Sequence, residues 1–511
     1  MKTANAFALP QLAFFAPERR DWKPVFAALC LFCAAVLVMW NVFQPKGFYH
    51  DEFDYIFLAK GTLAPSGFQI GSFSSPARLP LVPFVLFAAQ PLGTSYGNDL
   101  GLKVVELFFA FAALALIFLF AREVGDSQAL GGLAALLLAS NYLFLQYSGR
   151  VLTETALVAA TIGFAWACWR FVAKEKSAAP AVAFAILGLL TKQVFIGVLT
   201  AVPLALCLAF PAQTWQTFTK KRKTALFSII AFAILVSVSF VLFPASMNYY
   251  AEAMPRFASG TWNGLVAGNQ SGYSAWLTTN VLTTIFAEIG VFWFIILALS
   301  ALKHSFSRFC LYAVAAYCLL LAFFGGSEGI DRYLMPVIPF AVLGCAFQLK
   351  NSAEKLWNDN SLAHLPILLL TLLAVISTLT AITTFLPVDN AKFSTYEYAG
   401  AIVVREGGGT VLDNMPGYLA WYAGVPSQGI NYNDLIDFEQ KLAMEKPKWV
   451  VLSVKNIYAQ KQLPAAIEKY RAGTLNDSDV PEYVLARNTT FVPVYRWPSV
   501  GKTEFLLFRV E

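Results

Sequence analysis

Three carboxylates lie within four residues in a polar segment that directly follows the first apolar stretch. The segment reads Gly47-Phe48-Tyr49-His50-Asp51-Glu52-Phe53-Asp54-Tyr55. On a helix, Asp51 shares a face with Asp54 and with Tyr55. Carboxylates this close repel one another unless they meet a cation or a substrate. The spacing therefore predicts a general base, or a site for a metal or another cation. A solvated acidic turn that caps a helix through Asp51 is the alternative.

Cations and a further acid recur at the ends of later apolar stretches. Arg78 lies in Ser75–Phe84, whose three prolines interrupt an apolar run too often for a membrane span. Such a segment lies along the membrane interface or dips in against protein. Arg150 and Glu154 open one apolar stretch, Lys192 follows a short one, and Arg332 opens another. Each alone is also explained as an interfacial anchor or a helix cap.

These residues all lie on the outer side of the membrane when the loops rich in lysine and arginine are placed inside. A cavity with acids at Asp51, Glu52 and Glu154 and cations at Arg78, Lys192 and Arg332 suits an anionic phosphate leaving group and a base that deprotonates an acceptor. Further candidates for its lining are His50, Asp54, Tyr55, Arg150, Arg256 and Tyr333.

Composition places the chain in a membrane. Of 511 residues, 58% are hydrophobic and 13% are charged, and the mean hydropathy is +0.59. Soluble globular chains carry about 25% charged residues, so a soluble enzyme, a disordered chain and a nucleic-acid-binding protein are excluded. The seven cysteines lie in apolar segments. We interpret them as buried apolar residues and not as a disulfide framework or a zinc site.

Apolar stretches long enough to cross a bilayer predict a mainly α, polytopic membrane helical bundle. The first, which lacks a small-residue cleavage site, is interpreted as a retained signal anchor. We expect eleven spans, of which Ala178–Leu190 is short for a full span: Pro24–Phe43, Lys103–Phe120, Ala129–Leu145, Val151–Phe171, Ala178–Leu190, Val194–Phe210, Thr224–Phe243, Trp276–Ala301, Phe309–Phe324, Tyr333–Phe347 and His364–Phe385.

Lysine and arginine are unevenly distributed over the loops. With the N-terminus inside, inside loops hold sixteen and outside loops seven. This asymmetry follows the positive-inside rule and predicts a cytoplasmic N-terminus in a multi-pass plasma (inner) membrane protein. The first long loop, about residues 44–101, and the chain after the last span are then extracytoplasmic.

The C-terminal part is less apolar and mixes helix and strand patterns. Glu397–Arg405, Gly417–Tyr422 and Leu463–Arg471 are predicted to be helical, and Thr410–Leu412, Trp449–Val454 and Phe505–Val510 to be strands. We expect two domains, a transmembrane domain over residues 1–386 and a small extracytoplasmic α/β domain over residues 387–511.

Several short motifs occur in an order typical of one family. They are His50-Asp51-Glu52 with Tyr55 and Ala59, the segment Arg78–Phe84, Arg150 to Glu154, Leu189–Lys192, Arg332–Pro339, and Val411–Gly417 with Leu419–Gly424. With these motifs, the chain resembles polytopic GT-C glycosyltransferases of the protein O-mannosyltransferase-like and aminoarabinose-transferase-like group (glycosyltransferase family 39/83 type). The resemblance covers most of the chain.

The resemblance implies a function and roles for the site residues. Such enzymes transfer a sugar from a polyprenyl-phosphate donor to a lipid, glycan or protein at the outer membrane face. Asp51 is then the catalytic base, with Glu52 beside it, and Glu154 is the second acid. Arg78, Lys192 and Arg332 are expected to hold the carrier phosphate. Some members need a divalent metal, and the metal requirement stays open here. The family often has Asp in place of Glu154, and Gly in place of Gln193.

Two other interpretations differ in testable features. A transporter or a flippase of lipid-linked glycans places charges at mid-membrane on broken helices, often within inverted repeats. Here most ionisable groups lie at the predicted outer ends of the spans. A glycan polymerase or ligase depends on a large central outside loop, whereas Pro244–Ser274 is of moderate length.

Overall fold

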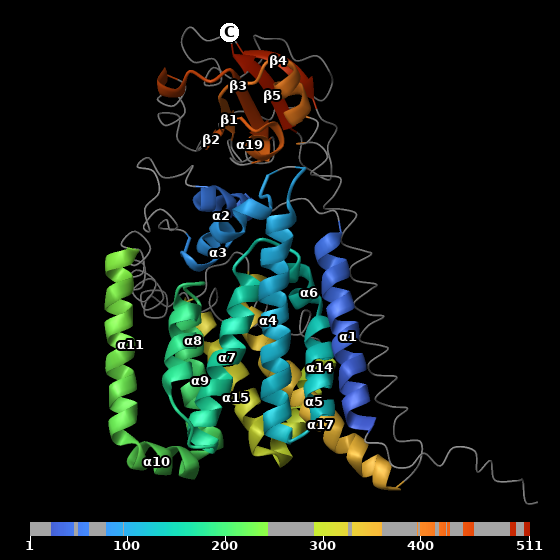
Figure 1. Ribbon diagram of the computed structural model, residues 1–511, viewed down its shortest axis with the longest axis vertical. Helices are drawn as coiled ribbons and strands as arrows, with labels where there is room; N and C mark the ends of the chain where they lie inside the picture. Colours follow the sequence, from blue (N-terminus) through green and yellow to red (C-terminus); the bar gives the residue numbers. More distant parts are fainter. Residues whose placement is uncertain are drawn as a thin grey trace, which may run out of the picture.

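A helical bundle and a small β-sheet make up the described part of the protein. The computed structural model describes residues 22–44, 50–60, 78–95, 97–243, 291–324, 330–359, 396, 399–413, 418–425, 427–429, 443–453, 491–496 and 505–510. The sheet lies beyond one end of the bundle, and α2 (His50–Lys60) and α3 (Leu81–Ala89) lie between the two (Figure 1). We call this end of the bundle the sheet-side end.

The bundle consists mainly of apolar helices, which satisfy their backbone hydrogen bonds internally, as lipid requires. They are α1 (Trp22–Phe43), α4 (Leu100–Gly125), α5 (Gln128–Ala139), α6 (Tyr142–Ser148), α7 (Glu154–Ala173), α8 (Ala179–Leu189), α9 (Phe195–Ala209), α10 (Pro211–Lys220), α11 (Arg222–Leu242), α14 (Val291–Lys303), α15 (Ser305–Phe324) and α17 (Ile338–Asp359). Short connections add η3 (Gln90–Leu92), α16 (Ile330–Tyr333) and η6 (Met335–Val337).

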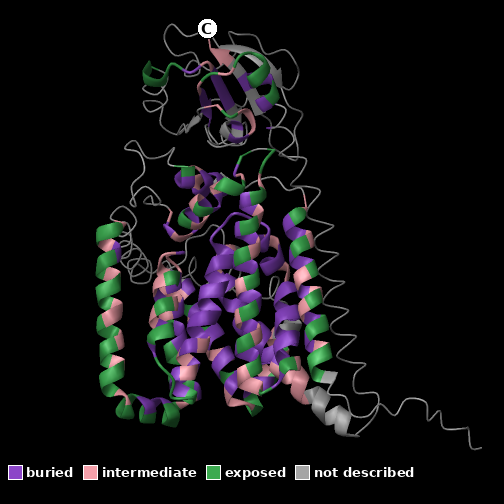
Figure 2. Ribbon diagram, in the orientation of Figure 1, coloured by how far each residue is buried: buried purple, intermediate pink, exposed green. Residues whose placement is uncertain are grey.

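Helix α7 forms the centre of the bundle. Most of its residues are buried (Figure 2), and it packs against α4, α8 and α9. Helix α5 is held close to two neighbours by glycines. A Cβ on Gly131 would come within 2.7 Å of the Phe118 carbonyl oxygen in α4, and one on Gly132 within 2.7 Å of the Ala27 Cα in α1. A larger residue at either position would push the helices apart.

Several predicted spans are confirmed as long apolar helices. Among the described residues, four helices are long and apolar enough to cross a membrane: Lys23–Phe43, Leu100–Gly125, Glu154–Ala173 and Arg222–Leu242. Up to six qualify when each of two bent helix pairs counts as one span. The predicted span His364–Phe385 and most of Trp276–Ala301 lie outside the described residues, so the total of eleven stays a prediction.

Two predicted spans differ in detail from the structure, and a third is followed by a sharp bend. Ala129–Leu145 is not one straight helix: α5 and α6 meet at 71°, because the Asn141 side chain caps the start of α6 by accepting the Phe144 N–H at 3.1 Å. After Val194–Phe210 the chain turns by 109° into α10. The span predicted to begin at Tyr333 begins at Ile338 instead, after a 3₁₀ turn that contains Pro336.

The sheet has five strands in the order β2-β1-β3-β5-β4. Strands β1 (Val411–Asp413), β2 (Ser427–Gly429) and β3 (Trp449–Ser453) are parallel, and β4 (Phe491–Arg496) and β5 (Phe505–Val510) complete the sheet through antiparallel pairing. The ladder shifts register between Pro493 and Tyr495 of the edge strand β4. Proline has no N–H to donate, so an edge strand tolerates it best.

The predicted strands of the tail correspond to β1, β3 and β5, whereas β2 and β4 had no prediction. The predicted helix at Gly417–Tyr422 is α19 (Tyr418–Ala423), and residues 399–405 are helical within the predicted Glu397–Arg405. The predicted helix Leu463–Arg471 lies outside the described residues. The domain boundary at residues 386 and 387 stays a prediction.

Candidate active site

Three elements far apart in sequence bring their polar ends together at the sheet-side end. Glu154 is the first residue of α7, Lys192 lies in the turn between α8 and α9, and Arg332 lies in α16. Helix α8 has 11 residues, or about 17 Å, against about 30 Å of hydrocarbon. Lys192, which follows this short helix, is largely buried within the protein, with 11% of its side chain exposed.

The carboxylate of Glu154 bridges the two cations. Lys192 Nζ lies 2.6 Å and Arg332 Nε 2.7 Å from the same oxygen, Oε1 of Glu154. The hydroxyl of Thr153 donates to the other oxygen at 3.4 Å. The Glu154 side chain is fully buried, whereas the Arg332 side chain is 27% exposed. A buried carboxylate is tolerated when it is paired in this way.

These three residues form what we call the Glu154 cluster. In it, two cationic side chains contact one oxygen of a buried carboxylate. Tyr333 belongs to its surroundings, because Lys192 Nζ lies 5.0 Å from the centre of the Tyr333 ring. The Tyr333 carbonyl accepts a hydrogen bond from the Tyr317 hydroxyl at 2.8 Å, which ties α16 to α15. The arrangement presents a fixed positive site that suits a phosphate oxygen.

A second buried ion pair joins α2 to the segment that leads into α7. Glu52 Oε2 lies 3.4 Å from Arg150 Nη1, and the Val151 backbone N–H donates to Glu52 Oε1 at 2.7 Å. Both charged side chains are almost completely buried. Because Val151 precedes Glu154 by three residues, this contact fixes the start of α2 relative to the Glu154 cluster.

A third pair lies on the opposite side of α2. Arg78 Nη2 lies 2.9 Å from Asp54 Oδ2, and the Arg78 guanidinium lies 5.5 Å from the centre of the Tyr55 ring. Just after Arg78, the Leu81 N–H donates to the Leu190 carbonyl at 3.1 Å. Leu190 is two residues before Lys192, so the segment that carries Arg78 lies against the turn that carries Lys192.

The structure thus joins nine of the predicted site residues through direct contacts. They fall into three adjoining groups: Glu154 with Lys192, Arg332 and Tyr333; Glu52 with Arg150; and Asp54 with Arg78 and Tyr55. His50 and Asp51 begin α2, immediately before Glu52, and their side chains lie outside the described part. Arg256 lies outside the described residues altogether.

Sequence reasoning missed several partners of these residues. The Val151 N–H, the Thr153 hydroxyl and the Tyr317 hydroxyl are ordinary groups that no local pattern marks. Trp421 of α19 was missed as a contact of α2: its ring centre lies 6.2 Å from that of Phe53. In addition, Lys60 Nζ lies 5.3 Å from the Trp421 ring. These contacts join α2 to α19, which itself packs against β1 of the sheet.

The described residues offer no group of three or more His, Cys, Asp or Glu side chains close enough to hold a metal ion. The acidic residues in this part of the site are instead paired with arginine or lysine. Because this search does not cover the side chains of His50 and Asp51, the metal requirement stays open.

Solved structures are similar to this chain over almost its whole length. ArnT from Cupriavidus metallidurans bound to undecaprenyl phosphate superposes with a TM-score of 0.64 at 11% identity, and the match covers 95% of this chain and 98% of that one. The apo state of the same protein gives a TM-score of 0.55 at 12% identity, over 95% and 97%. The chain has the GT-C fold.

A second solved protein with the GT-C fold supports this conclusion. The oligosaccharyltransferase AglB from Archaeoglobus fulgidus, in complex with an inhibitory peptide and a dolichol-phosphate, gives a TM-score of 0.52 at 13% identity. The match covers 95% of this chain and 74% of AglB. No protein-family model and no curated protein matches the sequence. The resemblance to a polytopic GT-C membrane protein, predicted from short motifs, is therefore confirmed at the level of fold.

Proposed function

We propose that this protein is a membrane glycosyltransferase that moves a sugar from a polyprenyl-phosphate donor to a lipid, glycan or protein acceptor at the outer face of the membrane. The observation that carries the proposal is the Glu154 cluster, a fixed pair of cations around one buried carboxylate. Support also comes from the GT-C fold shared with structures that contain undecaprenyl phosphate and dolichol-phosphate.

The cations are assigned to the phosphate of the donor. Lys192 and Arg332 are already fixed by Glu154, so they need little rearrangement when negative charge develops on the leaving phosphate. Arg78 adds a third cation from the neighbouring segment, where Asp54 and Tyr55 orient it. Glu154 acts in this proposal by holding the two cations in position, since both of its oxygens accept hydrogen bonds.

Asp51 is assigned the role of base. It lies one residue before Glu52, and Glu52 is anchored to Arg150 and to the Val151 N–H. The same anchor that fixes the start of α2 thus fixes the backbone of Asp51 beside the segment that leads into the Glu154 cluster. We assign Glu52 a positioning role for that reason.

The proposed reaction inverts the configuration at the anomeric carbon. The acceptor hydroxyl gives its proton to the Asp51 carboxylate, and the acceptor oxygen forms a bond to the anomeric carbon. The bond from that carbon to the phosphate oxygen breaks, and its electron pair leaves with polyprenyl phosphate. Lys192, Arg332 and Arg78 stabilise the negative charge on the departing phosphate.

The test compares wild-type protein with Asp51→Asn in proteoliposomes that contain radiolabelled polyprenyl-phosphate sugars and a membrane acceptor fraction from the source cells. Asp99→Asn is the matched control, because Asp99 pairs with Lys103 near the same end of the bundle and contacts none of the three groups of the site. We expect transfer by wild type and by Asp99→Asn, and a loss of at least a hundredfold in Asp51→Asn.

Two outcomes would contradict the proposal. Full activity of Asp51→Asn would show that Asp51 is not the catalytic base. Movement of the intact lipid-linked sugar to the opposite leaflet, without release of polyprenyl phosphate, would instead indicate a flippase.

A further inference from the structure

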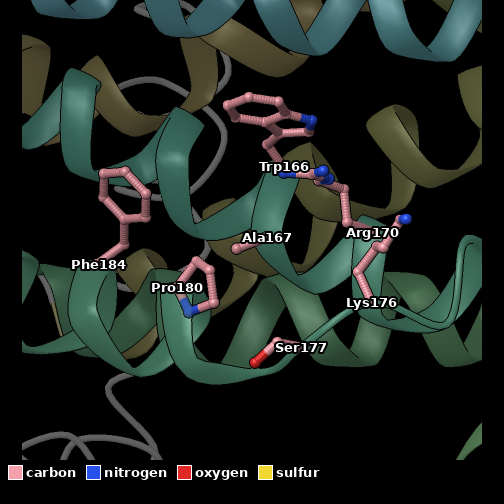
Figure 3. A pocket seen from close by; sticks show the side chains of 7 residues that line it. All are labelled: Trp166, Ala167, Arg170, Lys176, Ser177, Pro180 and Phe184. Carbon is pink, nitrogen blue, oxygen red and sulfur yellow. The ribbon is translucent and has the colours of Figure 1, made fainter.

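A pocket of about 240 Å³ lies at the end of the bundle opposite the candidate active site, between α7 and α8. Its lining consists of Trp166, Ala167, Arg170, Lys176, Ser177, Pro180 and Phe184 (Figure 3). Arg170 is 16 residues from Glu154 along α7, which corresponds to about 24 Å. The pocket is therefore separate from the site described above, and none of the proposed chemistry uses it.

The pocket has a charged side and an apolar side. Figure 3 shows Arg170 and Lys176 on one side and the Phe184 ring on the other. Arg170 is held in place by Glu123, whose Oε1 lies 3.2 Å from Arg170 Nε and whose Oε2 accepts the Trp166 indole N–H at 2.8 Å. The Arg170 guanidinium also lies 5.1 Å from the centre of the Trp166 ring.

More positive charge surrounds the charged side. The Lys221 ammonium donates to the Lys176 carbonyl at 3.3 Å and also to the Glu175 carbonyl, and Lys220 pairs with the Glu175 carboxylate at 3.0 Å. The corner between α10 and α11 thus lies against the segment that carries Lys176. Arg222 and Lys223 follow in this corner, both exposed and without an ion-pair partner in the described part of the chain. The positive charges here far outnumber the nearby acids Glu123 and Glu175.

Helix α10, next to this region, has the features of a helix that lies in the membrane interface. It runs across the end of the bundle after a bend of 109° from α9 (Figure 1). Thr214 and Thr217 are buried and face the protein, and Thr217 donates to the Val172 carbonyl at 3.1 Å. Trp215 is 74% exposed. Phe218 is 46% exposed, and its ring centre lies 6.0 Å from that of Phe171 in α7. Exposed aromatic residues beside lysines are typical of a helix that lies in the membrane interface.

We propose that this pocket binds one anionic phospholipid of the leaflet opposite the active site. The headgroup phosphate pairs with Lys176 and Arg170, and the start of an acyl chain lies along Ala167, Pro180 and Phe184. A volume of about 240 Å³ is below the roughly 300–1,000 Å³ of drug-sized ligand sites, so only the headgroup and the start of one acyl chain enter. Basic pockets between membrane helices on the cytoplasmic side suit such headgroups.

Phosphatidylglycerol serves as the probe, and native mass spectrometry as the readout. Full-length protein is reconstituted in phosphatidylcholine nanodiscs that contain a minority of phosphatidylglycerol, and the phosphatidylglycerol retained per protein is measured for wild type and Lys176→Gln. Lys174→Gln is the matched control, because Lys174 lies over the Trp169 ring at 5.7 Å and does not line the pocket. Ala167→Leu fills the apolar side without changing any charge.

We expect Lys176→Gln to bind phosphatidylglycerol about fivefold more weakly than wild type, which corresponds to about 1 kcal/mol for one basic residue. Ala167→Leu weakens binding by a similar factor, and Lys174→Gln by less than about twofold.

Equal losses in Lys174→Gln and Lys176→Gln would overturn the site, because they would indicate non-specific attraction to a basic surface. Equal retention of phosphatidylcholine, or displacement of phosphatidylglycerol by excess inorganic phosphate at matched ionic strength, would overturn the assignment to an anionic lipid. The readout does not involve sugar transfer, so its failure is independent of the proposed function.

Discussion

The two ends of the bundle use the same residue types in opposite ways. At the sheet-side end, the carboxylates of Glu154 and Glu52 are buried, with side-chain exposures of 0% and 2%. Glu154 pairs with two cations and Glu52 with one, all far away in sequence. At the opposite end, Glu123 and Glu175 pair with Arg170 and Lys220, and their side chains are 26% and 48% exposed.

This difference in burial gives the two sets of ion pairs different energetic properties. Removing charges from water costs several kcal/mol per ion, and pairing often does no more than offset that cost. The buried pairs therefore add little to stability compared with apolar residues of the same shape. Under the proposed function, they provide charges that are fixed before the substrate binds, as catalysis with a charged leaving group requires. The exposed pairs are screened by water and salt and carry no such requirement.

The largest expected effect is that of Glu154→Ala. The change leaves Lys192 and Arg332 close together without their shared carboxylate, and breaking a buried pair in this way costs about 3–5 kcal/mol. We expect a large drop in thermal stability in detergent and no measurable sugar transfer.

Glu154→Gln provides the control for lost volume, since it keeps the shape and one acceptor oxygen. It should retain more stability than Glu154→Ala and still be strongly impaired in transfer. Wild-type activity in Glu154→Gln would contradict the role of the negative charge in holding the two cations.

The next effect is that of Glu52→Gln. An amide oxygen can still accept the Val151 N–H, but the charge pair with Arg150 is lost. We expect a stability loss of about 1.5–3 kcal/mol. We also expect a fall in kcat of up to about a hundredfold with little change in donor KM, because a small displacement of Asp51 misaligns the base. Steady-state kinetics with the labelled donor separate these quantities. A rise in KM at unchanged kcat would show that Glu52 acts on donor binding instead.

The sequence indicated the candidate residues that the structure brings into contact, but not the groups that hold them in place. The short apolar stretch before Lys192 predicted that this cation lies within the protein, and the bundle places it there, in contact with Glu154. The pairing of Glu52 with Arg150 joins residues 98 positions apart, and the Val151 N–H belongs to no motif. Such contacts depend on how the helices pack, and a hydropathy pattern fixes the length of a helix but not its neighbours.

The same limit explains the errors in the fold. The apolar run over Ala129–Leu145 indicates a helix but does not reveal the break at Asn141, where a side-chain cap competes with continuation of the helix. In the tail, β1, β3 and β5 were predicted from apolar β-branched and aromatic runs. Strand β2, Ser427–Gly429, has no such composition, and only its pairing with β1 makes it a strand.

A smaller effect is expected for two substitutions of Lys192, one that removes its charge and one that keeps it. Lys192→Met removes one of the two charges that Glu154 holds, and we expect donor KM to rise about tenfold, as for loss of one charged hydrogen bond. Lys192→Arg keeps the charge but replaces a compact ammonium with a planar group, so it should recover part of that loss. Equal KM values for wild type and Lys192→Met would contradict the assignment of Lys192 to the donor phosphate.

The smallest effect is expected at the opposite end, for Glu175→Gln. The pair with Lys220 is 3.0 Å long, but its side chains are 48% and 61% exposed, and exposed pairs contribute about 0–1 kcal/mol. We expect the free energy of unfolding to change by no more than about 0.5 kcal/mol, and this difference from wild type to become smaller at high salt. Sugar transfer should equal that of wild type. Thermal unfolding at two salt concentrations measures the first two. A loss of unfolding free energy as large as that of Glu52→Gln would contradict this comparison of the two ends, because an exposed pair would then contribute as much as a buried one.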